Sequence, residues 1–365
     1  MTSITHTETA PPLGFTRLAM RSYEGISYRL VSTNPPRECT PEEIPIIDLD
    51  GIFKDDLEAR KAVAREMLSA AENSGFFYIK NHRIPEDVVT NTLVMGKDFF
   101  SLPVEEKRKV SSDVSSYGYD GLRERRTNPF SSADKRESYH FHYKPEFDPL
   151  HSTNPAAVPE KVLAHLPADD ALIWSHLQPA GFRAALVTHW QHCLTLARRL
   201  IRVLALALSL PETHFDSVTT YPGADLAVNY YPGHDDGGDD TDDAHAEVGI
   251  GAHTDLQILT LLYQQADGLQ VLNARDEWVR APPVAGTLVV NVGDFLMRLT
   301  NGRLRSTVHR VIQRGRGERF SVPFFFGFNF DEKLGVLPTC VDEAHPAKYE
   351  PVTCGELIAK RLALK

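Results

Sequence analysis

His253 and Asp255 are the residues whose types and spacing most favour chemistry. They lie two positions apart in GAHTDLQILTLLYQ (251–264), at the start of an apolar run that we expect to form a buried strand. On an extended backbone, side chains two positions apart point to the same side. Ionisable groups at the start of a buried strand need a partner, and a metal ion would satisfy both of them.

A third ligand is available in STVHRVIQR (306–314), where alternation places Thr307, His309 and Val311 on one face. Two histidines and one carboxylate on one side of a metal form a facial triad, which leaves coordination positions open and suits non-haem iron(II). Zinc accepts the same donors, so these residues do not choose between the two metals. For His309 alone, a core histidine with satisfied hydrogen bonds is the alternative interpretation.

Arg319 and Ser321 begin RFSVPFFFGFNF (319–330), an apolar segment that predicts a buried strand. A buried guanidinium without a partner is costly, so Arg319 must pair with a carboxylate of the protein or of a ligand. A serine hydroxyl two positions from an arginine forms a suitable cradle for a ligand carboxylate. Phe325 lies further along the same face and would form a wall of the adjoining pocket.

A second strand of this kind is predicted by DLAVNYYPG (225–233), with Asn229 and Tyr231 on one face. The Tyr231 phenol is a candidate donor to the same anion. Asn229 is a candidate for orienting a bound acid or a metal ligand. The alternative for both is an ordinary role in the core, which is common for aromatic residues in strands.

The helices and strands that position these residues can be predicted from the spacing of apolar residues. Helices are predicted over 56–75, 85–103 and 181–211, with short strands at 44–52 and 76–82. From about residue 224, strand-like runs recur between Gly, Asn, Asp and Pro turns, which is typical of an antiparallel sandwich or barrel. These runs are 225–231, 256–263, 268–272, 287–293, 306–313 and 319–330.

Composition limits the classes of partner. The 365 residues carry a formal net charge of −10, which argues against a nucleic-acid partner. The N-terminus lacks a signal-peptide pattern, and the apolar segments are too short or too charged to cross a bilayer. The four scattered cysteines contain no CxxC pair. We therefore expect a cytoplasmic protein with reduced thiols and without a membrane partner.

The segment HDDGGDDTDDAHAE (234–247) is the one compositionally biased stretch, with seven acidic residues in fourteen. Its acidic residues are out of register with the calcium-binding loop of an EF-hand. It therefore predicts a solvated loop. Because it precedes the proposed metal ligands, a lid over the site is the alternative.

Taken together, several segments resemble the isopenicillin N synthase-like family of iron(II)- and 2-oxoglutarate-dependent oxygenases, over about residues 44–335. They are NYYPG, AHTDLQILTLLYQ, GLQVLNARDEWVRAPPVAGTLVVNVGDFLMRLTNGRLRSTVHRVIQ and ERFSVPFFFGFN. The resemblance implies a mainly β fold, with a double-stranded β-helix (jelly roll) core and flanking α-helices.

On this resemblance we divide the chain into four parts. These are an irregular N-terminal extension (1–43), a mixed α/β and helical region that packs on the core (44–220), the jelly-roll catalytic core (221–335) and a C-terminal helical segment (336–365).

The same resemblance assigns roles to the residues above. It implies that His253, Asp255 and His309 bind iron(II). It also implies that Arg319 and Ser321, with Tyr231 assisting and Asn229 nearby, bind the distal carboxylate of 2-oxoglutarate. No catalytic residue is assigned beyond the metal ligands. Substrate-pocket candidates are Phe325 and, from SSYGYDGLRERR (115–126), Tyr117, Tyr119 and Arg123.

The implied activity is the O2-dependent oxidation of an unactivated C–H bond in a small organic molecule, by hydroxylation, desaturation or cyclisation. Natural-product metabolism is the expected setting, ascorbate the expected aid in vitro, and a monomer or weak dimer the expected state. One alternative is an iron oxidase of the same family that needs no cosubstrate and holds its substrate's own carboxylate on Arg319 and Ser321. Another is a non-catalytic metal-binding jelly roll.

Overall fold

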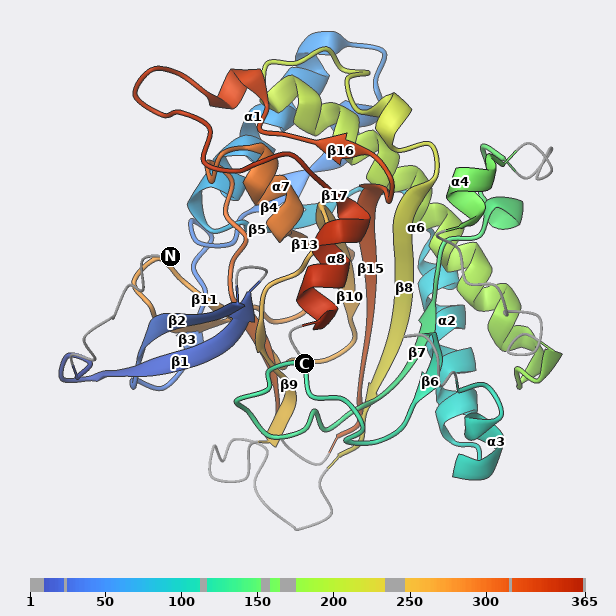
Figure 1. Cartoon of the computed structure of the whole chain (residues 1–365). Coiled ribbons are helices and arrows are strands. Elements are labelled where there is room, and N and C mark those ends of the chain that lie inside the picture. Colours follow the sequence, from blue (N-terminus) through green and yellow to red (C-terminus); the bar gives the residue numbers. More distant parts are fainter. Residues whose placement is uncertain are drawn as a thin grey trace.

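Two β-sheets that face one another form the core of the computed structural model (Figure 1). The larger sheet has the order β4 (Ile46–Asp48), β5 (Phe76–Lys80), β13 (Thr287–Val292), β10 (Leu259–Gln264), β15 (Arg319–Asn329), β8 (Pro222–Tyr231), β7 (Glu137–Phe141) and β6 (Gly118–Asp120). The smaller has the order β3 (Arg37–Glu38), β12 (Trp278–Arg280), β11 (Leu269–Leu272), β14 (His309–Gln313) and β9 (Glu247–His253). The jelly-roll prediction is confirmed. The structure describes residues 10–22, 25–111, 117–151, 158–164, 175–233, 247–314 and 317–363.

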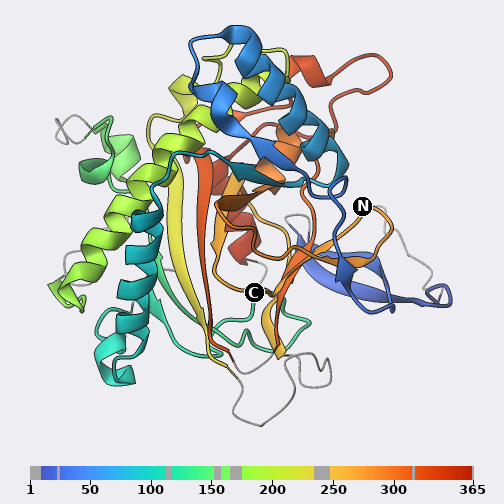
Figure 2. The same cartoon turned by 180° about the vertical axis from the view of Figure 1, so that it is seen from behind.

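Helices cover the outer face of the larger sheet. Figures 1 and 2 show α2 (Glu86–Phe100) and α6 (Ala180–Ala207) on one side of this sheet and the smaller sheet on the other. The first helix, α1 (Leu57–Asn73), packs against α6 and begins at Asp56, whose side chain accepts hydrogen bonds from two backbone amides of the first turn. The other α-helices of the described residues are α3 (Val104–Arg108), α4 (Glu160–Leu163), α7 (Asp294–Leu299) and α8 (Cys354–Ala363). Among the described residues, none of the helices combines the length and apolar character needed to cross a membrane.

Strand β15 separates the core from the interior of the jelly roll. Its alternate residues Phe320, Val322, Phe324 and Phe326 are buried in the main hydrophobic cluster together with residues of α6. The other set, which includes Arg319, Ser321 and Phe325, points to the opposite face of the sheet. The predicted alternation along this strand is therefore present.

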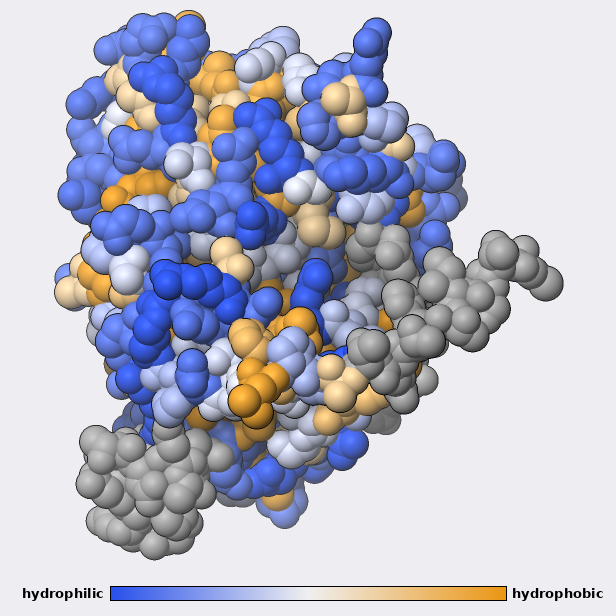
Figure 3. Space-filling model, turned by 90° about the vertical axis from the view of Figure 1, so that its left-hand side faces the viewer, coloured by the Kyte–Doolittle hydropathy of each residue, from blue (hydrophilic) through white to orange (hydrophobic). Residues whose placement is uncertain are grey.

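Where the structure describes the N-terminal extension, at 10–22 and 25–43, it contains regular strands, which differs from the irregular extension that we expected for 1–43. Strands β1 (Phe15–Ser22) and β2 (Gly25–Ser32) form an antiparallel hairpin. The hairpin buries little apolar surface: Met20 and Val31 pack near Trp278, whereas Ile26 and Tyr28 stay about 60% exposed. This sparse burial leaves only a weak hydrophobic pattern in the sequence. Figure 3 shows this side of the molecule, where hydrophobic residues form small groups among hydrophilic ones.

Both sheet pairings and helix packing cross the boundaries that we expected at 220 and 335. The larger sheet takes β4, β5, β6 and β7 from the region before 220, so that region extends this sheet at both of its edges. After 335, β17 (Val352–Thr353) pairs with β16 (Lys333–Leu334) before α8 begins. Helix α8 lies against β15 (Figure 1).

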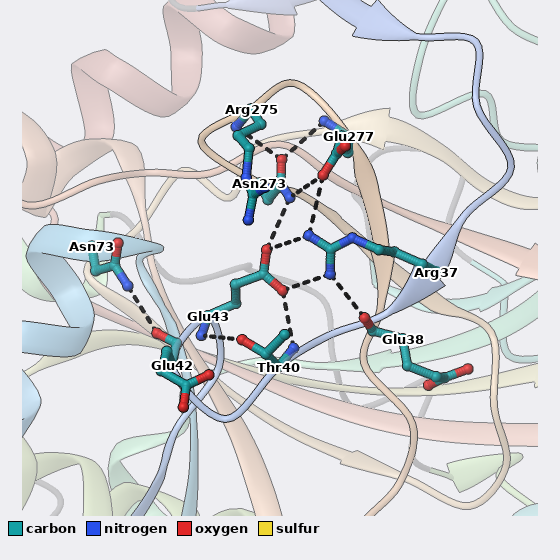
Figure 4. A network of polar contacts seen from close by, with 9 residues as sticks. All are labelled: Arg37, Glu38, Thr40, Glu42, Glu43, Asn73, Asn273, Arg275 and Glu277. Atoms are coloured by element: carbon teal, nitrogen blue, oxygen red, sulfur yellow. Dashed lines mark hydrogen bonds and ion pairs between the residues drawn. The ribbon is translucent and has the colours of Figure 1, made fainter.

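An ion-pair network attaches the N-terminal segment to the smaller sheet (Figure 4). The Arg37 guanidinium donates to both oxygens of Glu43, at 2.9 and 2.7 Å, and also to Glu277 at 3.1 Å. The Asn273 amide donates to both carboxylates. The hydrogen bond from Arg37 is the main reason that the pKa of Glu43 is lowered to about 2.

We predict that this network makes stability depend on pH in acid. Because the pKa of Glu43 falls from its ordinary 4.5 to about 2 on folding, its contribution is complete above pH 4.5 and is lost as the pH falls towards 2. The variant Glu43→Gln should therefore have a lower free energy of unfolding than wild type at neutral pH. The difference should shrink between pH 4.5 and the lowest pH at which both proteins fold. Urea unfolding measures it, with the exposed Glu343→Gln as control, and a pH-independent difference would contradict the prediction.

Candidate metal centre and anion cradle

Three predicted ligands come together at one edge of the smaller sheet. His253 ends β9, His309 begins β14, and these two residues are paired in the antiparallel register. Asp255 lies in the connection from β9 to β10. Its Oδ1 atom is 3.7 Å from Nε2 of each histidine. One ligand atom of each residue lies within 4.8 Å of the others, so the three could hold a metal ion.

Backbone carbonyls set the tautomer of both histidines. Nδ1 of His253 lies 2.8 Å from the carbonyl oxygen of Gly251, and Nδ1 of His309 lies 3.1 Å from that of Thr307. A carbonyl only accepts, so each Nδ1 carries the hydrogen and each Nε2 presents a lone pair. Burial and the adjacent His309 lower the pKa of His253 to about 3, so its ring is neutral at physiological pH.

Two side chains of the larger sheet fix the Asp255 carboxylate. Oδ2 accepts hydrogen bonds from the Thr260 hydroxyl at 2.6 Å and from the Asn291 amide at 2.7 Å. Oδ1 remains directed at the two histidines. Burial by itself raises the pKa of Asp255, but the two histidines and these two hydrogen bonds hold it below its usual value. The carboxylate is therefore charged and has one oxygen free for a cation.

Asp255 does not lie on a strand, which differs from our sequence interpretation. Strand β10 starts only at Leu259, and the connection before it is held by backbone hydrogen bonds. The amide of Asp294 donates to the carbonyl of Asp255 at 2.7 Å. Gly293 permits this close approach, because a Cβ atom there would collide with the carbonyl oxygen of Gln257. The ligand is thus placed by a tight loop rather than by strand alternation.

Sequence reasoning missed the residues that support this loop. The Asp294 carboxylate accepts hydrogen bonds from Ser306 at 2.6 Å and from Thr254 at 3.1 Å. Arg361 of α8 lies 3.5 Å from the same carboxylate and donates to the carbonyl of Thr254 at 3.3 Å. The only available signal was an Asp, Ser and Thr close in sequence to proposed ligands, which is too common to be informative.

The donor set fits iron(II). Two imidazole Nε2 atoms and one carboxylate oxygen on one side leave the other coordination positions open, as a facial triad requires. The hydrogen bonds to Nδ1 and to Oδ2 orient all three ligands before any metal binds. Zinc is compatible with the same donors, so geometry alone does not select the metal.

Arg319 is buried without a carboxylate partner among the described residues. It is 1% exposed, its Nε donates to the carbonyl of Ala266 at 3.1 Å, and its Nη2 lies 3.5 Å from Oε1 of Gln264. Nη1 is buried, and no described residue accepts its hydrogens. The guanidinium also lies over the Tyr231 ring, 4.7 Å from its centroid. A buried cation with an unused donor is suited to a ligand anion.

The other cradle residues surround Ser321. The register pairs Arg319 with Tyr231 and Ser321 with Asn229. The Tyr231 hydroxyl and the Asn229 amide are both 3.4 Å from the Ser321 hydroxyl. A second buried guanidinium, that of Arg136, donates to Oδ1 of Asn229 at 2.5 Å. Sequence reasoning missed Arg136, because it lies in a polar segment with no strand-like pattern.

The four predicted pocket residues lie in different places. Phe325 is half-buried on the cradle face of β15, and Tyr117 packs edge-on against His142. Tyr119 was a wrong prediction: it is 3% exposed in the main core, and its hydroxyl bonds Glu137.

Arg123 has a charged partner within the protein. It forms a partly exposed ion pair with Glu247 at 2.7 Å. The rest of the acidic segment, 234–246, is outside the described residues.

Two family models match the chain. The model of the 2OG-Fe(II) oxygenase superfamily matches residues 222–328. The model of the non-haem dioxygenase in morphine synthesis N-terminal region matches residues 44–162. The first match contains all three proposed metal ligands and the proposed cradle.

Individual proteins are similar over most of their length. A 2-oxoglutarate-Fe(II) type oxidoreductase, ppzC, of Metarhizium rileyi is 41% identical over 354 residues, which cover 95% of this chain and 94% of that protein. Feruloyl CoA ortho-hydroxylase F6H1-1 of Ipomoea batatas is 30% identical over 322 residues, covering 87% and 79%. The crystal structure of full-length Neurospora crassa T7H with alpha-KG and thymine has a TM-score of 0.71 at 26% identity, covering 88% of this chain and 96% of that one.

We predict that Asn291 contributes to metal affinity without touching the metal. Asn291→Ala should weaken binding of Mn(II) or Co(II), measured by calorimetry under nitrogen, by roughly 10- to 100-fold, because the Asp255 carboxylate loses one of its two orienting hydrogen bonds. The matched control is Asn329→Ala, another buried asparagine, whose amide bonds Ser217 and Thr220 instead. Equal metal affinity in Asn291→Ala and wild type would refute this role.

Proposed function

Since this chain belongs to the 2OG-Fe(II) oxygenase superfamily, we propose that His253, Asp255 and His309 bind its iron(II) and that Arg319 and Ser321 bind the distal carboxylate of 2-oxoglutarate. The protein is a 2-oxoglutarate-dependent dioxygenase, and its reaction uses iron(II), 2-oxoglutarate and O2. When bound, the iron couples the oxidative decarboxylation of 2-oxoglutarate to the oxidation of a substrate C–H bond.

The observation that carries the assignment is the buried Arg319 guanidinium with an unused Nη1. A carboxylate of 2-oxoglutarate would accept from this atom and from the Ser321 hydroxyl, in a charge-assisted arrangement. The Tyr231 ring lies against the Arg319 guanidinium, and the Tyr231 hydroxyl contacts the Ser321 hydroxyl. Asn229 orients Ser321 and is itself held by Arg136. These contacts would hold the far end of the cosubstrate in a fixed orientation.

The substrate is a small organic molecule, and Phe325 and Tyr117 are the aromatic residues that we place beside it. Phe325 is opposite Thr260 in the register, and Thr260 bonds the proposed ligand Asp255. Oxidation of a natural product is the reaction that we propose, and hydroxylation has a precedent in the similar feruloyl CoA ortho-hydroxylase. The net charge of −10 favours a small molecule over a nucleic acid as partner. We further propose a cytoplasmic monomer or weak dimer.

We predict that His309→Ala abolishes metal binding and 2-oxoglutarate turnover while the fold persists. The test measures succinate after incubation with iron(II), ascorbate and 2-oxoglutarate, with thermal unfolding as the check on folding. The control is His214→Ala, because His214 belongs to a second His-x-Asp sequence and is exposed. Normal succinate formation by His309→Ala would refute the triad. Substrate-dependent O2 use without succinate in wild type would instead identify an oxidase that needs no cosubstrate.

We predict that Arg319→Ala raises the concentration of 2-oxoglutarate needed for half-maximal turnover, through loss of a buried charge pair worth roughly 2–5 kcal/mol. Gly268→Ala should act in the same direction, because its Cβ would lie 3.1 Å from Nε of Arg319. Gly286→Ala is the matched control: Gly286 also has a positive φ of 71°, but its Cβ would meet no atom within 4 Å. If Arg319→Ala needed the same concentration of 2-oxoglutarate as wild type, Arg319 would have a purely structural role.

A further inference from the structure

Beyond the cradle, the inner face of the larger sheet carries a second polar group, where β15, β8 and β7 lie side by side (Figure 1). Along β15, Phe325 is four residues beyond Ser321, or about 13 Å at the usual rise per residue. The register places Asp225 of β8 opposite Phe325. His142 immediately follows β7 and reaches Asp225 from the next strand. The cradle and this group therefore occupy opposite ends of one surface.

This group is close to the proposed metal ligands. Thr260, whose hydroxyl bonds Asp255, is opposite Phe325 on β10, and Asp225 is opposite Phe325 on β8. Asp225 is thus two strands from Thr260, a separation of about 10 Å at the usual spacing between strands. A small molecule placed over Phe325 would lie between Asp225 and the metal.

The Asp225 carboxylate fixes the orientation of His142. Nδ1 of His142 lies 2.5 Å from Oδ1 of Asp225, and the Gln257 amide donates to Oδ2 at 3.2 Å. Because a carboxylate only accepts, Nδ1 of His142 carries the hydrogen, and in the neutral ring Nε2 is an acceptor. Nε2 is buried, and none of the described residues forms a hydrogen bond with it. An acceptor buried without a donor is unfavourable.

We propose that Nε2 of His142 binds the substrate, by accepting a hydrogen bond from an N–H or O–H group near the carbon that is oxidised. This inference rests on the proposed function and names the substrate class: small molecules with a hydrogen-bond donor, neutral or cationic at that position. An anionic group there would meet the Asp225 carboxylate and the Nε2 lone pair. The Tyr117 ring contacts His142, and Phe325 is opposite Asp225 in the register; aromatic rings next to the pair suit an apolar or cationic ligand body. Asp225 and Gln257 act as positioning residues.

The test uses matched pairs of small probes on the full chain loaded with iron(II) and 2-oxoglutarate under nitrogen. The probes are 2-piperidone and cyclohexanol, each compared with its N- or O-methylated counterpart, which has no hydrogen-bond donor, by ligand-observed NMR titration. Wild type should bind at least one donor-bearing probe about tenfold more tightly than its methylated partner. His142→Ala should lose this preference, and His142→Gln, which keeps a side-chain acceptor, should retain part of it.

The control is His345→Ala, which removes a histidine that pairs with Asp342 through Nδ1 in the same way but on the exposed surface. It should leave the preference unchanged. A wild type without any preference, or the same preference in His142→Ala, would overturn the inference. Binding of iron(II) and 2-oxoglutarate is measured first in each protein. Its failure in wild type would refute the proposed function, whereas intact cosubstrate binding without probe discrimination would refute only the role of His142.

Discussion

The arrangement of the site depends on how the Asp255 carboxylate is held between the two sheets. Thr260 and Asn291, on adjacent strands of the larger sheet, bind one of its oxygens. The other oxygen faces two histidines of the smaller sheet, which are paired across β9 and β14. The metal site therefore exists only when both sheets have formed and face each other. This explains why a jelly roll, with two sheets around one interior, suits a triad of ligands that are distant in sequence.

Burying a guanidinium beside this triad is the second constraint, and the neighbouring backbone is adapted to it. The Arg319 guanidinium contacts a backbone carbonyl, an amide oxygen and an aromatic ring, but no carboxylate of a described residue. The close approach of Gly268 leaves room for its side chain. Without a ligand, these contacts offset only part of the free-energy cost of burying the charge. Binding of an anion is therefore favoured. The same argument applies at lower cost to His142, whose buried Nε2 forms no hydrogen bond with any described residue.

The sequence was most informative where an ionisable side chain stands at an apolar, strand-like run. The predicted strands from 225 to 330 are present, and the three proposed ligands lie together because two of them flank paired strands. Alternation failed at Asp255, where backbone hydrogen bonds to a loop decide the position. Tyr119 was a pocket candidate because of its segment and its phenol, but its ring lies in the main core. Arg136, Asn291 and His142 act through partners on distant strands. Short-range patterns carry no information about such pairs, and the β1–β2 hairpin buries too little to produce a pattern.

The two faces of β15 have a consequence for evolutionary divergence. Phe324 and Phe326 pack among the helices, whereas Phe325 between them borders the interior of the jelly roll. On the proposed function, a change at 325 would alter the surface that faces a ligand and would leave the packing of the adjacent aromatic residues in place. Related enzymes can therefore acquire new selectivity at this position with little loss of folding stability, while the adjacent positions remain under selection for packing.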